Sequence, residues 1–500
     1  MQMKERPSFL NSIKWAYTGN WGERAFSALF MFILAAMLGP RDFGVISIAL
    51  TQVLFLQMFL DQGLAAALIQ RKDLKQEHLD AVFWMDLALS LVLLLLSIVF
   101  CRWWARLNHA PEAAPVIAAI SISIVIEALA VVQTSLLRRG MDFKSLSIRT
   151  NTAVVVSGLV GIGMAVAGFR VWALVGQQIV RDITALILLW RLSPWRPRLE
   201  FSWKHLRELM GFSLPNFTAQ LANFADNQAS SVLLGLLFGP IALGLYRLAD
   251  RFVNSVVVMA TSSIQAVSLP EFSRLQENPA ELRKSALSCI RLSASLTLPA
   301  LAGLAAVGSP LMRSVGPQWE PASNVLKILC LAGMCIIFAY FTGPLMQALA
   351  RTHQLAVLEW ARTAVGVLLL VAVGLAVRHS SLNSQIVGIG LARLATSALL
   401  VTPVFLYILM RLAGISWPDL GSSLFPSLAA AGSIAVAVTA VQSSGILIAA
   451  RPVFQLASEV VIGGAVGIAI LLALDAHLRH VAVRIIMRVP HRPVVSLQPE

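Results

Sequence analysis

The feature that most constrains this chain is a series of about fourteen long, nearly continuous apolar segments. Each is long enough to cross ~30 Å of hydrocarbon as a helix of ~20 residues. They run roughly over residues 18–38, 43–68, 80–101, 114–136, 150–169, 171–190, 211–238, 241–266, 288–308, 322–348, 354–377, 386–410, 422–442 and 453–474. A membrane β-strand would instead be a ~10-residue stretch of alternating polarity. We therefore predict an all-α integral membrane protein with about 14 transmembrane helices.

Composition supports this prediction. Apolar residues make up 57% of the chain and charged residues 13%, whereas a soluble domain carries about 25% charged residues. No cleavable signal peptide is recognised, so the first apolar segment is read as the first span. The cysteines lie in or beside apolar segments, without metal-type spacing, at Cys101, Cys289, Cys330 and Cys335. We interpret them as core residues and expect no metal and no cofactor.

The basic residues predict the orientation of the chain. With a cytoplasmic N-terminus, 25 of the 39 lysines and arginines fall on the cytoplasmic side and 7 on the other, and the rest lie within the spans. Such a bias follows the positive-inside rule. It predicts a multi-pass protein with both termini in the cytoplasm. It also accounts for most of the net charge of +14, so we expect membrane lipids, and no nucleic acid, as the partner of the basic surface.

A Gly-Pro pair recurs after 200 residues, first as Gly39-Pro40 and then as Gly239-Pro240. The glycine four positions further on recurs as well, at residues 44 and 244. Repeated hairpins in a membrane chain indicate tandem helix bundles, an architecture that transporters often have. We predict two six-helix lobes in parallel tandem repeat plus a C-terminal helix pair. The predicted parts are an N-terminal lobe (1–190), a cytoplasmic interfacial linker (191–210), a C-terminal lobe (211–411), the additional helix pair (412–475) and a basic cytoplasmic tail (476–500).

Charged residues inside the spans are the candidate site residues, because a charge at the bilayer centre costs at least ~2.5–3.5 kcal/mol. All the basic ones except Lys327 are arginines: Arg24, Arg181, Arg247, Arg251, Arg362 and Arg393. An arginine keeps its charge in any setting and binds phosphate through two nitrogens. This group predicts a cavity for an anionic headgroup that carries phosphate.

Some of these charges have a structural alternative. Acids adjoin Arg24, Arg181 and Arg251 in sequence, and Glu359 lies one helical turn before Arg362, so ion pairs within the fold would also explain them. Asp226, Asp250 and Glu359 are candidates for coupling to a proton or a sodium ion. Pairing of Asp226 with an arginine is the other interpretation of that residue.

Five stretches, in this order, resemble the polysaccharide transporter family of Wzx-type lipid-linked oligosaccharide flippases: Leu38-Gly39-Pro40-Arg41-Asp42-Phe43-Gly44, residues 61–74, Leu137-Arg138-Arg139-Gly140-Met141-Asp142-Phe143, residues 239–246, and Gly316-Pro317-Gln318-Trp319-Glu320-Pro321-Ala322. The superfamily also contains drug exporters and the lipid II flippase. The resemblance covers about residues 10–415. It implies a V-shaped pair of six-helix lobes around a cationic cavity, which flips a polyprenyl-diphosphate-linked oligosaccharide across a bacterial inner membrane.

The first functional hypothesis is therefore a flippase for surface or exopolysaccharide synthesis that works by alternating access. Its expected partners are the lipid-linked oligosaccharide, membrane lipids and a coupling ion, with a polysaccharide polymerase as a further candidate. A drug or metabolite exporter on the same fold is the alternative, although the buried arginines disfavour it. We expect no enzyme, because a membrane polymerase or ligase would need a sizeable outer loop. A scaffold without transport activity stays open.

Overall fold

The computed structural model describes residues 9–60, 64–71, 73–210, 213–444, 452–475 and 479, and over these residues its regular structure is entirely helical. A first group contains α1 (Phe9–Met37), α2 (Pro40–Gln57), α3 (Leu64–Gln70), α4 (Gln76–Leu107), α5 (Ala113–Ile120), α6 (Ile122–Arg139), α7 (Phe143–Val166) and α8 (Val171–Leu192). The short α9 (Trp203–Met210) follows. The predicted basic tail lies outside the described residues, residue 479 apart, as do residues 61–63 and 72 of the second family-like stretch.

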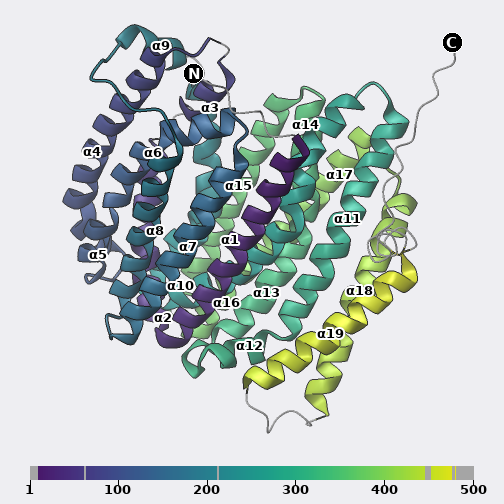
Figure 1. The fold of residues 1–500 in the computed structure, drawn as a ribbon. Helices are drawn as coiled ribbons and strands as arrows, with labels where there is room; N and C mark the ends of the chain where they lie inside the picture. The colour runs from purple at the N-terminus through teal and green to yellow at the C-terminus, as the bar shows by residue number, and fades with distance from the viewer. Residues whose placement is uncertain are drawn as a thin grey trace, which may run out of the picture.

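A second group contains α10 (Ser213–Arg274), α11 (Pro279–Ala306), α12 (Gly308–Val315), η1 (Pro317–Trp319), α13 (Ala322–Cys335), η2 (Ile336–Phe338), α14 (Ala339–Ala348), α15 (Thr352–Ala376), α16 (Leu382–Ala395), the π-helix η3 (Thr396–Val401) and α17 (Thr402–Ala413). The last pair is α18 (Trp417–Ser443) and α19 (Pro452–Leu474). In Figure 1 this pair lies at the outer side of the second group, where α18 packs against α11 and α19 against α12.

The number of helical stretches agrees with the number of predicted spans. Among the described residues, 11 stretches are long and apolar enough to cross a membrane. One of them, Phe224–Arg274, is counted once although it breaks at Gly239, and α1 and α2 are not among the 11. Dividing that stretch and adding α1 and α2 gives the predicted fourteen. The prediction of an all-α membrane protein with about 14 spans is confirmed.

Several predicted spans are not continuous helices. The segment 322–348 breaks at η2, and the segment 386–410 contains the π-helix η3. Such breaks are tolerated in lipid where a neighbouring side chain satisfies the freed backbone groups. Thr402 does this, because its hydroxyl donates to the carbonyl oxygen of Cys335 at 2.8 Å, at the end of α13. Apolarity places a segment in the bilayer without showing whether its helix is continuous.

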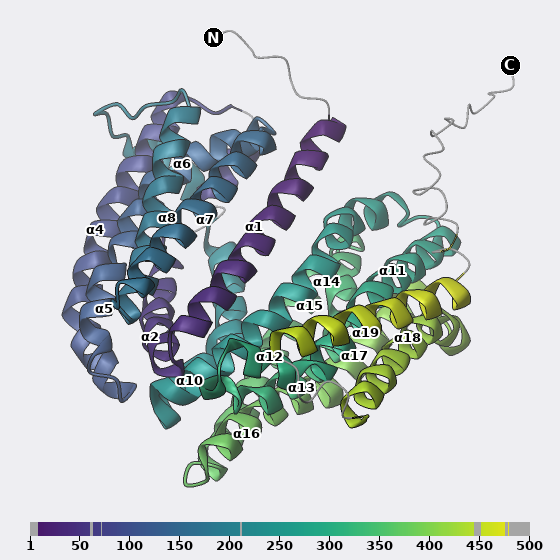
Figure 2. The ribbon, with the colours of Figure 1, turned by 60° about the horizontal axis from the view of Figure 1, so that its bottom comes forward.

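The two groups of helices converge near α2 and α10 and separate toward the other end, with α1 between them (Figure 2). We call the converging end the Gly-Pro face; it contains the turns at Gly39 and Gly239 and the loop 316–321. The opposite end, with the loop 193–202 and α9, is called the basic face. One apolar cluster joins the groups near the Gly-Pro face and includes the buried Leu34, Ile48, Leu245 and Leu326.

The repeated glycines form the contact between the two groups. A Cβ on Gly44 would overlap the carbonyl oxygen of Pro240, and a Cβ on Gly244 would overlap the carbonyl oxygen of Pro40. Only glycine permits two backbones to approach this closely. The contact is reciprocal, as expected where two equivalent hairpins meet across a pseudo-two-fold axis. It supports the predicted tandem repeat.

Candidate functional site

A cavity of about 320 Å³ lies between the two groups of helices. Its walls come from α1, α2, α7 and α8 on one side and α10 on the other. Its polar lining consists of Ser27, Ser47, Ser157, Gln177, Gln178, Arg181, Gln228, Arg247, Asp250, Arg251 and Asn254. Amide, hydroxyl and guanidinium groups therefore dominate its polar surface, and a ligand there would contact both groups of helices.

Three of the predicted arginines meet at this cavity. Arg181 comes from α8, whereas Arg247 and Arg251 lie one turn apart on α10, so they line the same wall. Arg247 donates from Nη2 to Oε1 of Gln228 at 2.6 Å. Arg251 is exposed to the cavity, and within the part of the chain that the structure describes it forms no ion pair. Its guanidinium is available to an anion.

A second cavity of about 530 Å³ continues the first one toward the basic face, and Leu54, Gln178 and Arg181 line both. Its polar groups come from α6, α7 and α8, together with Gln57 of α2. They include Ser123, Glu127, Thr134, Ser135, Arg138, Arg149, Thr150 and Asp182. Arg138 and Arg149 lie between the predicted spans 114–136 and 150–169, but both belong to helices and line this cavity.

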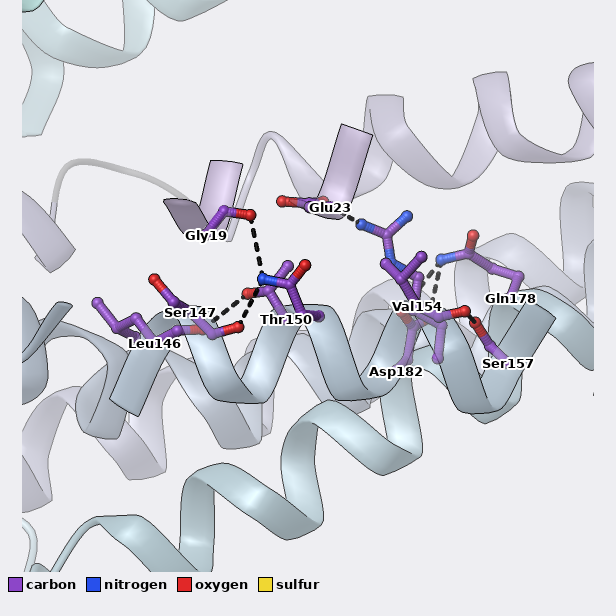
Figure 3. A network of polar contacts seen from close by, with 11 residues as sticks. Gly19, Glu23, Leu146, Ser147, Thr150, Val154, Ser157, Gln178 and Asp182 are labelled. Atoms are coloured by element: carbon purple, nitrogen blue, oxygen red, sulfur yellow. Dashed lines mark hydrogen bonds and ion pairs between the residues drawn. The ribbon is translucent and has the colours of Figure 1, made fainter. Parts of the chain in front are cut away.

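Hydrogen bonds tie α1 to the walls of these cavities (Figure 3). Glu23 on α1 accepts from Nη2 of Arg181 at 2.7 Å. Asn151 on α7 donates from Nδ2 to the carbonyl oxygen of Gly19 at 3.1 Å, and Gly19 is closely approached by Ser147. Asp182 accepts from Gln178 at 3.1 Å and also from the Ser123 hydroxyl. The contacts of Glu23 and Gly19 hold α1 against α8 and α7.

A separate charged cluster lies inside the second group of helices. Nη2 of Arg362 pairs with Oδ2 of Asp226 at 3.0 Å and with Oε2 of Glu359 at 2.9 Å, and the Arg362 side chain is only 15% exposed. A small cavity of about 30 Å³ beside it is lined by Arg393 and by Thr396 and Ser397 of the π-helix. Single π turns often mark functional positions. For Asp226, the structure shows the arginine pairing.

Two predicted residues, Arg24 and Asp250, remain to be placed. Arg24 is half-buried on α1 beside Glu23, and it forms no ion pair among the described residues. Asp250 lines the central cavity between Arg247 and Arg251 in sequence. The structure thus brings four predicted residues together at the central cavity and four at the second cluster. The glutamines of α8 were not predicted, although Gln177, Gln178, Arg181 and Asp182 already formed a polar stripe at helical spacing.

The central cavity is closed toward the Gly-Pro face. Beyond the glycine crossing, Trp319 of the loop 316–321 is completely buried and donates from Nε1 to the carbonyl oxygen of Ala35 at 2.7 Å. Its ring meets the ring of Phe43 edge to face, with centroids 5.2 Å apart. A loop of the second group is therefore anchored on α1 and α2 of the first. Farther from this face, Phe55 of α2 still contacts Phe224 of α10, with ring centroids 5.7 Å apart.

Comparison with known proteins gives relatives that are named for polysaccharide biosynthesis. The chain is 29% identical to the succinoglycan biosynthesis transport protein ExoT of Rhizobium meliloti over 64% of this chain and 65% of ExoT. It is 24% identical to the teichuronic acid biosynthesis protein TuaB of Bacillus subtilis over 59% of this chain and 62% of TuaB. It thus spans slightly less than two thirds of the length of these two relatives. The lipopolysaccharide biosynthesis protein WzxC of Escherichia coli is 22% identical over 70% of this chain and 72% of WzxC.

The fold is that of known transporters. The lipid II flippase MurJ, in an inward closed conformation, superposes with a TM-score of 0.73 and 15% identity, covering 94% of this chain and 99% of MurJ. An inward-facing multidrug resistance MATE transporter of the MOP superfamily superposes with a TM-score of 0.60 and 17% identity, covering 78% of this chain and 95% of its own. At such identities the likeness shows the fold alone. A family model described as "Polysaccharide biosynthesis protein" matches residues 33–324, more than half of the chain, and this chain therefore belongs to that family.

Proposed function

We propose that this protein moves a polyprenyl-diphosphate-linked oligosaccharide repeat unit across the bacterial inner membrane. The observation that carries the proposal is the central cavity, in which arginines from both groups of helices converge. Arg251 forms no ion pair among the described residues, so its guanidinium would bind a phosphate oxygen without first breaking one. The adjoining cavity offers hydroxyl and amide groups that suit the hydroxyls of a sugar.

The proposed mechanism is alternating access. The cavity is closed toward the Gly-Pro face by the glycine crossing and Trp319, so substrate would enter from the basic face and leave after that closure opens. Arg181, Arg247 and Arg251 would hold the diphosphate, with Arg24, Arg362 and Arg393 as further candidates. Asp226, Asp250 and Glu359 are the candidate groups for coupling to a proton or sodium ion. No chemical bond needs to be made or broken.

The proposal also assigns an orientation and a division of the chain. The basic face would lie in the cytoplasm with both termini, and the lobes would comprise residues 1–190 and 211–411, joined by the linker 191–210. Reporter fusions at residue 500 and in the loop 309–321 test the orientation. A periplasmic signal from the C-terminal fusion would overturn it.

The direct test is a reconstituted transport assay. Purified protein is placed in liposomes that contain a fluorescent polyprenyl-diphosphate oligosaccharide, and the fraction exposed to an impermeant quencher is followed with time. The wild type is expected to move the labelled lipid, and the Arg247→Ala/Arg251→Ala double variant is expected to fail. The matched control is Arg378→Ala, which removes an exposed arginine at the Gly-Pro face. Movement of cationic drugs but not of the labelled lipid would favour the exporter alternative.

A further inference from the structure

A third hollow lies away from the central cavity, between α15 and α17. Its volume is about 680 Å³, and Met346 of α14 forms its floor. Its remaining lining is Arg351, His353, Gln354, Val357, Leu358, Ala361, Tyr407, Ile408, Arg411 and Leu412. On α15 these residues lie on a different side of the helix from Glu359 and Arg362, which point toward Asp226 of α10. We call this hollow the α15–α17 groove.

The groove results from the way these helices pack. Toward the Gly-Pro face, α15 packs against α16 and the π-helix η3. In the other half of the span, α17 packs against α14, where the Thr342 hydroxyl donates to the carbonyl oxygen of Phe405 at 3.2 Å. The extra residue of a π turn shifts the helix that follows it. Beyond η3, both α15 and α17 pack against α14, and among the described residues a hollow lies between these two helices at the basic face.

The groove faces outward from the helix bundle. Val357 on α15 is 58% exposed and Tyr407 on α17 is 62% exposed. Nearer the Gly-Pro face, the apolar Leu368 of α15 and Leu399 of η3 are 68% and 77% exposed. In a membrane-spanning bundle, large apolar side chains that are this exposed are in contact with lipid tails. The open side of the groove therefore faces the bilayer.

Charge is concentrated at one end of the groove. Arg351 and His353 lie at the start of the α15 span, and Arg411 lies near the end of the α17 span, so all three are at the basic face. Among the described residues, neither arginine pairs with a carboxylate, and Arg411 donates from Nη1 to the Tyr407 hydroxyl at 3.3 Å. From His353 to Ala361 the groove descends by about 12 Å along α15, between apolar walls. It thus combines a cationic end at headgroup depth with an apolar slot below it.

We propose that the α15–α17 groove binds an anionic phospholipid of the leaflet at the basic face. The phosphate would lie between Arg351 and Arg411, which both offer planar donors, and an acyl chain would run along Val357 and Ala361. Basic pockets between membrane helices on the cytoplasmic side are recognised sites for such headgroups. A phospholipid fits better than the transported lipid, because the groove opens to the bilayer and is separated from the cavity between the groups. The inference does not depend on the proposed transport function.

The test is lipid retention by the full chain. Detergent-purified protein is mixed with equal amounts of phosphatidylglycerol and phosphatidylcholine, and the bound lipids are weighed by native mass spectrometry. The wild type is expected to retain phosphatidylglycerol preferentially. Arg351→Ala/Arg411→Ala should lower the affinity for phosphatidylglycerol roughly 20- to 30-fold. Each Lys or Arg near an anionic lipid surface contributes ~1 kcal/mol, and this variant removes two of them. Arg351→Lys/Arg411→Lys should retain part of the preference.

Two controls separate this site from others. Arg378→Ala should leave phosphatidylglycerol retention unchanged, because this arginine lies at the Gly-Pro face. Ala361→Phe keeps every charge, fills the slot at an exposed position and should also reduce retention. Equal retention by the wild type and the arginine double variant would overturn the proposal. Displacement of phosphatidylglycerol by polyprenyl diphosphate would overturn it as well, by assigning the groove to the transported lipid.

Discussion

At the scale of single residues, the arginines within the spans differ in what surrounds them. Arg251 is exposed to the central cavity without an ion pair among the described residues, whereas Arg362 is enclosed and holds two carboxylates. The sequence shows both as arginines within apolar segments and does not distinguish them. In the structure, replacing the two arginines has different consequences. Without Arg251 the cavity loses a binding group, whereas without Arg362 two carboxylates lose their partner.

The Arg251→Ala variant is expected to reduce transport about 10- to 100-fold, because a charge-assisted contact to phosphate contributes about 1.5–3 kcal/mol. Arg251→Lys should give an intermediate rate, since the ammonium keeps the charge but cannot make two parallel bonds. Membrane abundance should not change for either variant, because no carboxylate loses its partner. Transport in liposomes and immunoblots of membranes measure the two quantities. A wild-type rate in Arg251→Ala would remove this residue from the mechanism.

The Arg362→Ala variant is expected to destabilise the protein by on the order of 3 kcal/mol, because Asp226 and Glu359 would stay half-buried without a cation. Thermal unfolding of the detergent-purified chain measures the loss. The triple variant Arg362→Ala/Asp226→Asn/Glu359→Gln should recover most of it by removing the stranded charges. If Arg362→Ala instead unfolds like the wild type but does not transport, Arg362 acts on substrate or ion directly.

At the scale of the helices, the crossing of α2 and α10 brings the backbones of the two groups into direct contact at Gly44 and Gly244. Gly44→Ala and Gly244→Ala should each lower the unfolding temperature, and by similar amounts, because each added methyl meets an equivalent proline carbonyl of the other hairpin. Gly432→Ala is the control, since nothing lies within 4 Å of the added Cβ and alanine favours the helix. A large loss in only one of the two variants would argue against the pseudo-two-fold relation.

Helix breaks also have consequences at this scale. The π-helix η3 lies beside the Arg393 cavity, and beyond it α15 and α17 separate to form the groove. The π-helix thus contributes both to the small polar cavity beside Arg393 and to the α15–α17 groove. The breaks between α13 and α14 and within 386–410 face each other through Thr402 and Cys335, so they compensate one another.

At the scale of the whole molecule, the closure at the Gly-Pro face sets which side of the cavity is accessible. Trp319→Ala removes a buried ring and its hydrogen bond to Ala35, and Trp319→Phe removes the hydrogen bond alone. Spin labels at the exposed positions 170 and 378, one on each group, report their separation. Trp319→Ala should shift the distance distribution to longer values, and Trp319→Phe should shift it less. An unchanged distribution would show that the glycine crossing suffices for closure.

The fold was predictable from the sequence because each span is a nearly continuous apolar run and because the Gly-Pro hairpin repeats in register. The site was predictable only in part. Arg138 and Arg149 lie close to the ends of predicted spans. At such positions the sequence does not show whether an arginine belongs to a loop or lines a cavity from the last turn of a helix. Which arginine meets which acid depends on helix rotation, and the pairing of Arg362 with Asp226 across 136 residues leaves no local signal.

The reciprocal contact of the hairpins has a consequence for how such a chain can be assembled. Pro40 and Gly44 lie four residues apart on one side of α2, and Pro240 and Gly244 do so on α10. Each hairpin therefore carries both the proline carbonyl that contacts the other hairpin and the glycine that leaves room for the other hairpin's carbonyl. That is the property of an isologous homodimer interface, in which one surface is complementary to itself. A half-length polypeptide with a single such hairpin already contains every group that this contact requires. Joining two copies end to end turns a subunit interface into a contact within one chain.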